Sequence, residues 1–351
     1  MPVMLLDQAL HWSLALIPVL VLLAIFVSFD AFKLMSFTEI LVLLALGGVA
    51  ALASYPVSGR LLDTLPIGFN NYSRYYAPWI EEAIKGAVLV ILFRMNKVGF
   101  KLDAVLTGFA VGAGFSVVEN MIYLFRFPDY GSGTWLVRGL GTAVMHGTTL
   151  AILAASAHEF AERETRGAAG EFDFNLLWFI PGYIAAGALH MAFNQLPDRP
   201  LLAMLGASML APIAILAIFQ FGTAEAQSWL EAEQKEHRAQ LAALRAGRWP
   251  EGAGSERIAA LAARCGNDLA AKLRRYWEVM AYLVVEAEET LLEEAAGDAE
   301  FDRVKIEDAF EELAGLRRSI GASTFAQFSR LLPFSRNDHW ELSELRERVR
   351  K

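Results

Sequence analysis

The chain has 351 residues, of which 55% are hydrophobic, and its mean hydropathy is +0.36. The formal net charge of −8 gives no basic surface for nucleic acid, so no nucleic-acid partner is expected. The one cysteine, Cys265, excludes an intrachain disulfide framework and any multi-cysteine metal site.

Charge is distributed unevenly along the chain. Residues 1–221 contain 12 Lys and Arg and 15 Asp and Glu, whereas residues 222–351 contain 19 and 24. The first part is too apolar for a soluble domain, and the second has the composition of soluble helices. We therefore expect an all-α protein, with a polytopic membrane helix bundle in residues 1–221 and a helical soluble C-terminal tail in residues 222–351.

A helix that crosses the bilayer needs about 20 mostly apolar residues. About seven transmembrane helices are predicted on this rule, at residues 9–29, 37–54, 78–95, 105–125, 135–157, 176–196 and 201–221. The first has no basic residue before it, so we interpret it as a retained helix and not as a cleaved signal peptide.

The loop charges predict the orientation of these spans. With the N-terminus outside, the inner loops hold six basic residues and the outer loops four, and basic residues favour the cytoplasmic side. The six are Lys33, Arg94, Lys97, Lys101, Arg163 and Arg166, and the four are Arg60, Arg74, Arg126 and Arg199. This orientation also places the tail in the cytoplasm.

The tail is expected to be helical at 224–245, 258–294, 301–318 and 340–350, with a Gly- and Pro-rich break at 247–254. The long second segment is amphipathic because its apolar residues recur every three or four positions. We find no catalytic constellation in the tail and expect His237 at its surface. The tail is interpreted as a regulatory or assembly domain that can bind a cytoplasmic partner.

Several polar residues fall inside the predicted spans. Ionisable side chains there are costly and mark functional sites. The third span contains Glu81, Glu82 and Lys85, the fourth Glu119, the fifth His146, and the sixth His190 and Asn194.

Spacing along each helix indicates which of these side chains share a face. Glu81 and Lys85 are four residues apart and are expected to pair, which turns Glu82 toward a different neighbour. His190 and Asn194 are also four apart and can address the same reacting atom.

Depth in the bilayer follows from the helical rise of about 1.5 Å per residue. On that measure Glu82, Glu119 and His190 all lie within about 10 Å of one membrane surface, and His146 lies somewhat deeper. We therefore expect one buried polar cluster from four helices, near the outer surface.

Structural roles compete with this interpretation. The Glu81–Lys85 pair could be a buried ion pair, and Asn120 is expected to hydrogen-bond between helices. Gly108 and Gly112 form a small-residue pattern that lets helices approach closely. His158 is expected at the membrane interface, since the His-Glu-x-x-His pattern of zinc proteases is absent there.

The ordered motifs resemble the PrsW family of bacterial intramembrane proteases. The matching residues are Glu81-Glu82 with Lys85, Phe115 with Glu119, His146, and His190 with Asn194. That family is distantly similar to the CAAX prenyl endopeptidase type, in which a glutamate of the Glu-Glu motif activates water. The resemblance implies a multi-pass enzyme of the bacterial cytoplasmic membrane. It would cleave a membrane-anchored protein substrate, similar to an anti-sigma factor.

Two mechanisms remain open for such an enzyme. In one, no cofactor is needed, because Glu82 or Glu81 is the general base while His190 and Asn194 hold the oxyanion. In the other, Zn²⁺ is bound by Glu119, His146 and His190, with Glu81 or Glu82 as the base.

Other classes of protein also bury such groups. The alternative functions are an ion-coupled transporter or membrane receptor that uses the same cluster, and a catalytically silent scaffold. The absence of a convincing internal repeat disfavours the transporter.

The predicted topology can be tested with cysteines introduced at Asp198 and in the tail. A membrane-impermeant reagent should label Asp198→Cys in intact spheroplasts, because the loop charges place this loop outside. A tail cysteine should react only after permeabilisation. Labelling of the tail in intact spheroplasts would overturn the assignment.

Overall fold

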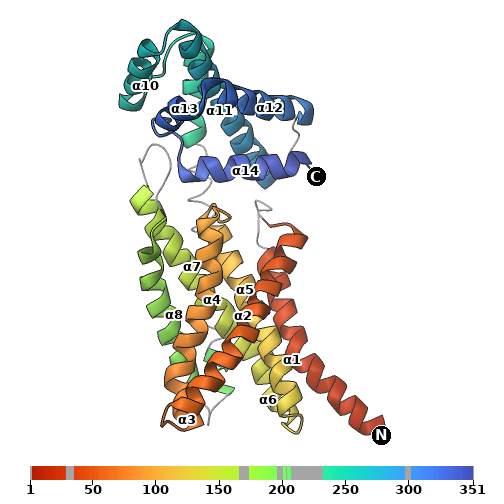
Figure 1. Cartoon of the computed structure of the whole chain (residues 1–351). Helices are drawn as coiled ribbons and strands as arrows, with labels where there is room; N and C mark the ends of the chain where they lie inside the picture. Colours follow the sequence, from red (N-terminus) through yellow and green to blue (C-terminus); the bar gives the residue numbers. More distant parts are fainter. Residues whose placement is uncertain are drawn as a thin grey trace. The chain divides into compact units, whose positions relative to one another are not determined.

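The computed structural model describes residues 2–28, 35–165, 174–195, 201–202, 204–206, 232–296 and 302–350. Within these ranges the regular elements are all helices, which confirms the predicted all-α class. The chain forms two compact units, whose helices are labelled in Figure 1. The membrane unit contains α1 to α8 except the last turn of α7, and the tail unit contains that turn and the helices after residue 231.

Five segments of the membrane unit are long and apolar enough to cross a membrane, among the described residues. They agree with the predicted first, second, fourth, fifth and sixth spans, so the chain is a multi-pass membrane protein. The helices concerned are α1 (Pro2–Ser28), α2 (Phe37–Thr64), α5 (Lys101–Arg126), the run α6 (Ser132–Leu136), η2 (Val137–Thr142) and α7 (Ala143–Thr165), and η3 (Leu176–Trp178) with α8 (Phe179–Asn194).

Two predicted spans are absent from this set. The third forms helix α4 (Ala77–Arg94), whose Glu81, Glu82, Lys85 and Arg94 carry more charge than a span identified by composition permits. It nevertheless packs against α2 and α8 inside the bundle. The seventh, 201–221, lies mostly outside the described residues. The described part of the chain therefore supports five candidate spans where seven were expected.

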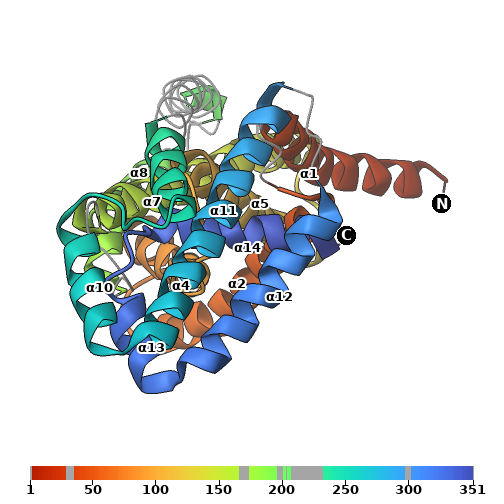
Figure 2. The ribbon, with the colours of Figure 1, turned by 90° about the horizontal axis from the view of Figure 1, so that it is seen from above.

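Helix α1 lies at one edge of the bundle, and its N-terminal end points away from the other helices (Figures 1 and 2). Its apolar side chains, including Ile17, Leu20 and Val21, are about half exposed in the protein alone. In a membrane protein such a surface faces lipid, so α1 has a lipid-facing side and a side packed on α5.

Helix α5 occupies the centre of the bundle because its glycines let neighbouring backbones approach. A Cβ atom on Gly112 would lie 2.2 Å from the carbonyl oxygen of His146, and one on Gly108 would lie 2.5 Å from that of Leu150. Both neighbours belong to α7. The predicted close helix contact is confirmed, and it sets the distance between α5 and α7.

Two further expectations for the bundle can be compared with the structure. The side-chain amide of Asn120 donates to the carbonyl oxygen of Ala15 at 2.9 Å, which confirms its role between helices. The ring of His158 is buried and its Nε2 lies 2.7 Å from the carbonyl oxygen of Gly99, while its position at the membrane interface stays a prediction.

The tail unit is a separate helical domain with its own core. After the helix of residues 232–245 come α10 (Ala253–Arg264), α11 (Asn267–Ala296), α12 (Arg303–Ile320), α13 (Ala322–Ser329) and α14 (Arg336–Arg350). The single helix expected at 258–294 is interrupted at Gly266, whose φ of +79° favours glycine. The apolar face expected for this segment is buried at Leu273, Trp277, Met280 and Val284 and partly buried at Leu261 and Leu269.

The tail unit also buries polar side chains. The expected surface position of His237 is wrong: the residue is only 4% exposed, since its helix packs inward through Leu241 and Leu244. Glu341 is also fully buried. Burial, followed by the negative charge of Asp338, raises the pKa of the Glu341 carboxyl well above its ordinary value.

Gly112→Ala should destabilise the bundle, because the new methyl group would force α5 and α7 apart at the level of His146. Overpacking of this kind costs about 1–3 kcal/mol. Thermal unfolding of the detergent-solubilised protein should therefore occur at a lower temperature. Gly59→Ala is the matched control, since nothing lies within 4 Å of a Cβ at that position of α2. Equal unfolding temperatures for the two variants would contradict the proposed contact.

Candidate active site

A cavity of about 720 Å³ lies within the membrane unit. Its walls come from the second half of α2, the start of α4, the second half of α5, η2 and the end of α8. The ionisable and amide side chains of interest on these walls are Glu81, Glu119, Arg138, His190 and Asn194.

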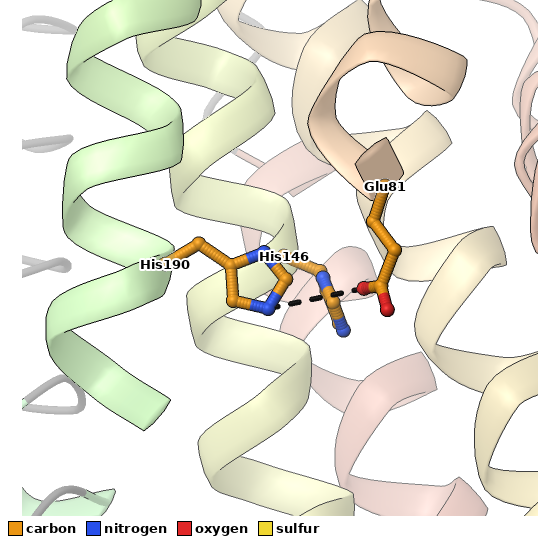
Figure 3. A group of neighbouring side chains, drawn as sticks. All are labelled: Glu81, His146 and His190. Atoms are coloured by element: carbon orange, nitrogen blue, oxygen red, sulfur yellow. Dashed lines mark ion pairs between the residues drawn. The ribbon is translucent and has the colours of Figure 1, made fainter. Parts of the chain in front are cut away.

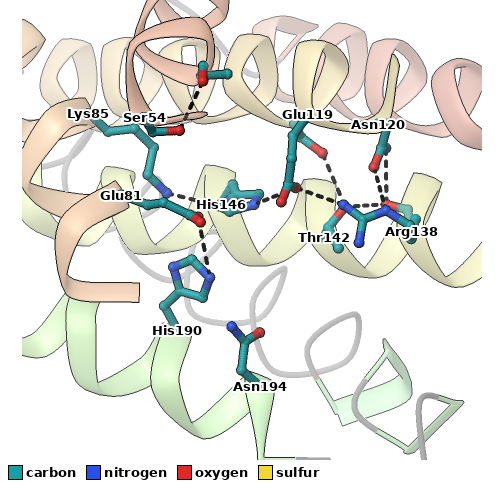
Figure 4. Close-up of polar contacts among 12 residues, drawn as sticks. Ser54, Glu81, Lys85, Glu119, Asn120, Arg138, Thr142, His146, His190 and Asn194 are labelled. Atoms are coloured by element: carbon teal, nitrogen blue, oxygen red, sulfur yellow. Dashed lines mark hydrogen bonds and ion pairs between the residues drawn. The ribbon is translucent and has the colours of Figure 1, made fainter. Parts of the chain in front are cut away.

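The structure brings the site residues expected from the sequence into one region (Figure 4). Glu81 and Glu82 lie in the first turns of α4, and Glu119 lies in the last two turns of α5. His146 lies in the first turn of α7, and His190 is one turn from the end of α8. Four helices therefore present these side chains at the same end of the bundle.

The expected pairing of Glu81 with Lys85 is wrong. Lys85 Nζ lies 2.6 Å from Glu82 Oε1, and both side chains are completely buried. Positions three and four apart share a helical face, and packing decides between them. Here the side chain of Glu82 is completely buried in the bundle, while that of Glu81 lines the cavity.

The Glu82 carboxylate has two more partners. Thr149 donates a hydrogen bond to its Oε1 at 3.1 Å, and Nδ1 of His190 lies 2.8 Å from the same oxygen. A carboxylate can only accept here, so His190 carries its proton on Nδ1. This leaves Nε2 of His190 as an acceptor, 3.8 Å from Glu81 Oε2.

His146 is held from both sides. Lys85 Nζ donates to its Nδ1 at 2.8 Å, so the proton of the neutral ring lies on Nε2, 3.2 Å from Glu119 Oε2. The ring also packs against Phe115 and, edge to face, against His190, with both centroid distances at 4.9 Å.

Arg138 belongs to the site and was missed by the sequence analysis. Its guanidinium lies 2.9 Å from Glu119 Oε2 and 3.6 Å from the ring centroid of Tyr123, and it also donates to Asn120. The π-helical turn η2 presents this arginine to α5. An arginine inside the predicted fifth span was the available signal.

Asn194 lines the cavity, but the hydrogen-bond partner of its side chain is not one of the site residues. Its Nδ2 donates to the carbonyl oxygen of Ser73 at 2.9 Å, which links α8 to the π-helical turn η1 (Tyr72–Tyr76). His190 and Asn194 were expected to address the same reacting atom, and the structure shows that both line the same cavity.

Glu81, His146 and His190 form a group whose ligand atoms lie within 4.8 Å of one another (Figure 3). Ligand atoms about 2.1 Å from a tetrahedral Zn²⁺ lie about 3.4 Å apart, so the 3.8 Å between Glu81 and His190 is close to what an ion needs. His146 fits by position, although both of its nitrogens have other contacts. The set expected from the sequence had Glu119 in place of Glu81.

A multi-pass helix bundle with carboxylates and histidines around a cavity is compatible with an intramembrane hydrolase, and the family comparison identifies the class. Residues 32–221, more than half of the chain, match the PrsW family intramembrane metalloproteases. The chain belongs to this family, and it is a peptide hydrolase. This confirms the resemblance drawn from the motifs. Neither the curated proteins nor the solved structures gave a significant match.

Lys85→Met should reduce the yield of folded protein, because it leaves Glu82 as an unpaired charge in the bundle. Breaking a buried pair costs about 3–5 kcal/mol, whereas removing both charges is often neutral. Adding Glu82→Gln to Lys85→Met should therefore restore the yield, as measured by size-exclusion chromatography in detergent.

Lys272→Met is the control for this experiment, since Lys272 pairs with Asp268 at the surface of the tail unit. It should leave the yield unchanged. If the Lys85→Met/Glu82→Gln protein is recovered no better than Lys85→Met alone, charge compensation is not the reason for the loss.

Proposed function

We propose that this chain hydrolyses a peptide bond of a membrane-anchored protein at the cavity lined by Glu81, Glu119 and His190. The observation that carries the proposal is the shared cavity, which two carboxylates and a histidine reach. The buried Glu82 holds the histidine in place, and Arg138 holds Glu119. The family match supports hydrolysis over the transporter and scaffold alternatives.

The two glutamates of the motif have different roles in this proposal. Glu81 faces the cavity and is therefore the member that can contact water and substrate. Glu82 is a positioning residue, because its oxygen fixes the tautomer of His190 and turns Nε2 toward Glu81.

The family's metal ion would be held by Glu81, His146 and His190. An ion held by these residues would supply a lowered pKa of bound water and polarisation of the scissile carbonyl group. Glu119 remains free of this set and accepts the proton of the attacking water, while Arg138 keeps its carboxylate in place. This version is favoured over the metal-free mechanism by the family and by the 3.8 Å separation of Glu81 and His190.

Asn194 supplies a donor for the substrate in this scheme. Its amide nitrogen has two N–H groups, of which one binds the carbonyl oxygen of Ser73. The second is available to the oxyanion that forms during hydrolysis.

The site also suggests where the substrate is cut. The cluster lies at the starts of α4 and α7 and toward the ends of α5 and α8, which the loop charges place outside. We therefore propose cleavage near the outer surface of a bacterial cytoplasmic membrane, with the N-terminus of the chain outside and the tail in the cytoplasm. A membrane-anchored regulator similar to an anti-sigma factor is the substrate class implied by the family.

Glu81→Gln and Glu119→Gln should each lower turnover by about 10²–10⁴, the usual contribution of acid–base groups. Terminal proteomics of membranes from cells that express each protein would measure the loss of cleaved products and map the cleaved bond. Asp129→Asn is the control, because this carboxylate is exposed and does not line the cavity.

Metal analysis of the same proteins assigns the carboxylates. Glu81→Gln should lose bound metal, whereas Glu119→Gln should keep it and still be inactive. The reverse pattern would restore the ligand set expected from the sequence. Wild-type turnover by both variants would refute the proposed site.

A further inference from the structure

A second group of buried carboxylates surrounds a histidine in the tail unit, outside the region matched to the family. Three helical segments contribute to it. Glu233 and His237 come from the helix of residues 232–245, Glu288 from α11, and Asp338 and Glu341 from α14. Spacings of four and three residues place each pair on one helical face. Metal sites in helical bundles are built from such side chains on facing helices.

The histidine is oriented as a metal ligand would be. Nδ1 of His237 lies 2.7 Å from Glu288 Oε1, and its Nε2 lies 3.8 Å from Asp338 Oδ2. The ligand atoms of these three residues lie within 4.8 Å of one another, and all three residues are buried. A carboxylate on one ring nitrogen is the usual support of a histidine that binds metal through the other.

Several buried carboxylate oxygens of this group have no hydrogen-bond partner, which indicates a cation site. Both oxygens of Glu341, Oε2 of Glu288 and Oδ1 of Asp338 are buried without a hydrogen-bond partner. Glu341 is buried on the same face of α14 as Asp338, three residues earlier, and the charges of Asp338, Glu288 and Glu233 act on its carboxyl group. Ionised carboxylates only accept hydrogen bonds and cannot satisfy one another. A protonated His237 would neutralise the negative charge of only one of these carboxylates.

We propose that the tail unit binds a divalent transition-metal ion between Nε2 of His237 and the carboxylates of Asp338 and Glu341, while Glu288 holds the imidazole through Nδ1. The imidazole favours Zn²⁺ or Mn²⁺ over Ca²⁺ and Mg²⁺, which prefer sites made only of oxygen ligands. The ion connects the helix of residues 232–245 with α14, and Glu288 connects α11 to the same histidine. This site is separate from the proposed catalytic metal.

The experiment measures the metal content of the full-length protein after two residues of the proposed membrane metal site have been replaced. Purified Glu81→Gln/His190→Ala protein is equilibrated with Zn²⁺ or Mn²⁺, dialysed and analysed by mass spectrometry for metal. It should retain about one ion per chain. Adding Glu341→Gln or His237→Gln should lower the affinity at least about tenfold, as the loss of a ligand or its support does.

Glu289→Gln is the matched control, since Glu289 follows Glu288 on α11 but pairs with Arg238 at the surface. It should bind metal like the parent. Thermal unfolding in EDTA separates binding from folding: Glu341→Gln should unfold no earlier than the parent, because it removes an unpartnered buried carboxyl group.

Three results would overturn the proposal. They are failure of the parent to retain Zn²⁺ or Mn²⁺, equally tight binding of Ca²⁺, and binding by Glu341→Gln and His237→Gln that equals that of Glu289→Gln. None depends on catalysis, so the tail site can fail while the proposed protease site holds, and the reverse.

Discussion

The buried pair of Glu82 and Lys85 is the interaction on which the rest of the membrane site depends. Two opposite charges with no exposed surface lie 2.6 Å apart. Removing them from water is costly unless further hydrogen bonds complete their coordination. Glu82 therefore takes hydrogen bonds from Thr149 and His190, and Lys85 donates to His146. The need to compensate one ion pair thus fixes the orientation of both histidines.

Backbone packing makes this network possible. Because Gly112 has no Cβ atom, the carbonyl oxygen of His146 can lie in the space that a larger residue at position 112 would need. This close approach lets Glu119 on α5 reach the His146 ring. The π-helical turns η1 and η2 precede α4 and α7, and η2 carries Arg138 to Glu119. Such turns occur often at functional sites because they change which side chains face inward. The geometry of the site thus has its origin in small residues and irregular turns as much as in charged ones.

The sequence predicted the membrane bundle and the helices that carry the site, since hydropathy and helical spacing are local properties. It could not predict which glutamate pairs with Lys85, because positions three and four apart share a face and only α7 and α8 decide between them. The same charges excluded α4 from the candidate spans, so the helix that carries Glu81 and Glu82 does not have the composition of a typical membrane span. Arg138 was missed because its partner, Glu119, lies 19 positions earlier on another helix.

His237 illustrates the same limit in the tail unit. Its neighbours in sequence are mostly polar and indicate a solvated helix, whereas the carboxylates that surround it come from α11 and α14. The two histidines share one geometry: His190 and His237 each have Nδ1 beside a buried glutamate and Nε2 at 3.8 Å from a second carboxylate. Exposure separates them, since the side chain of Glu81 is 15% exposed and lines a cavity, whereas that of Asp338 is 1% exposed. A catalytic metal needs an open position for water, and a structural one is enclosed by protein ligands. The two proposals therefore use the same pair of contacts, with an open metal position in the membrane unit and an enclosed one in the tail unit.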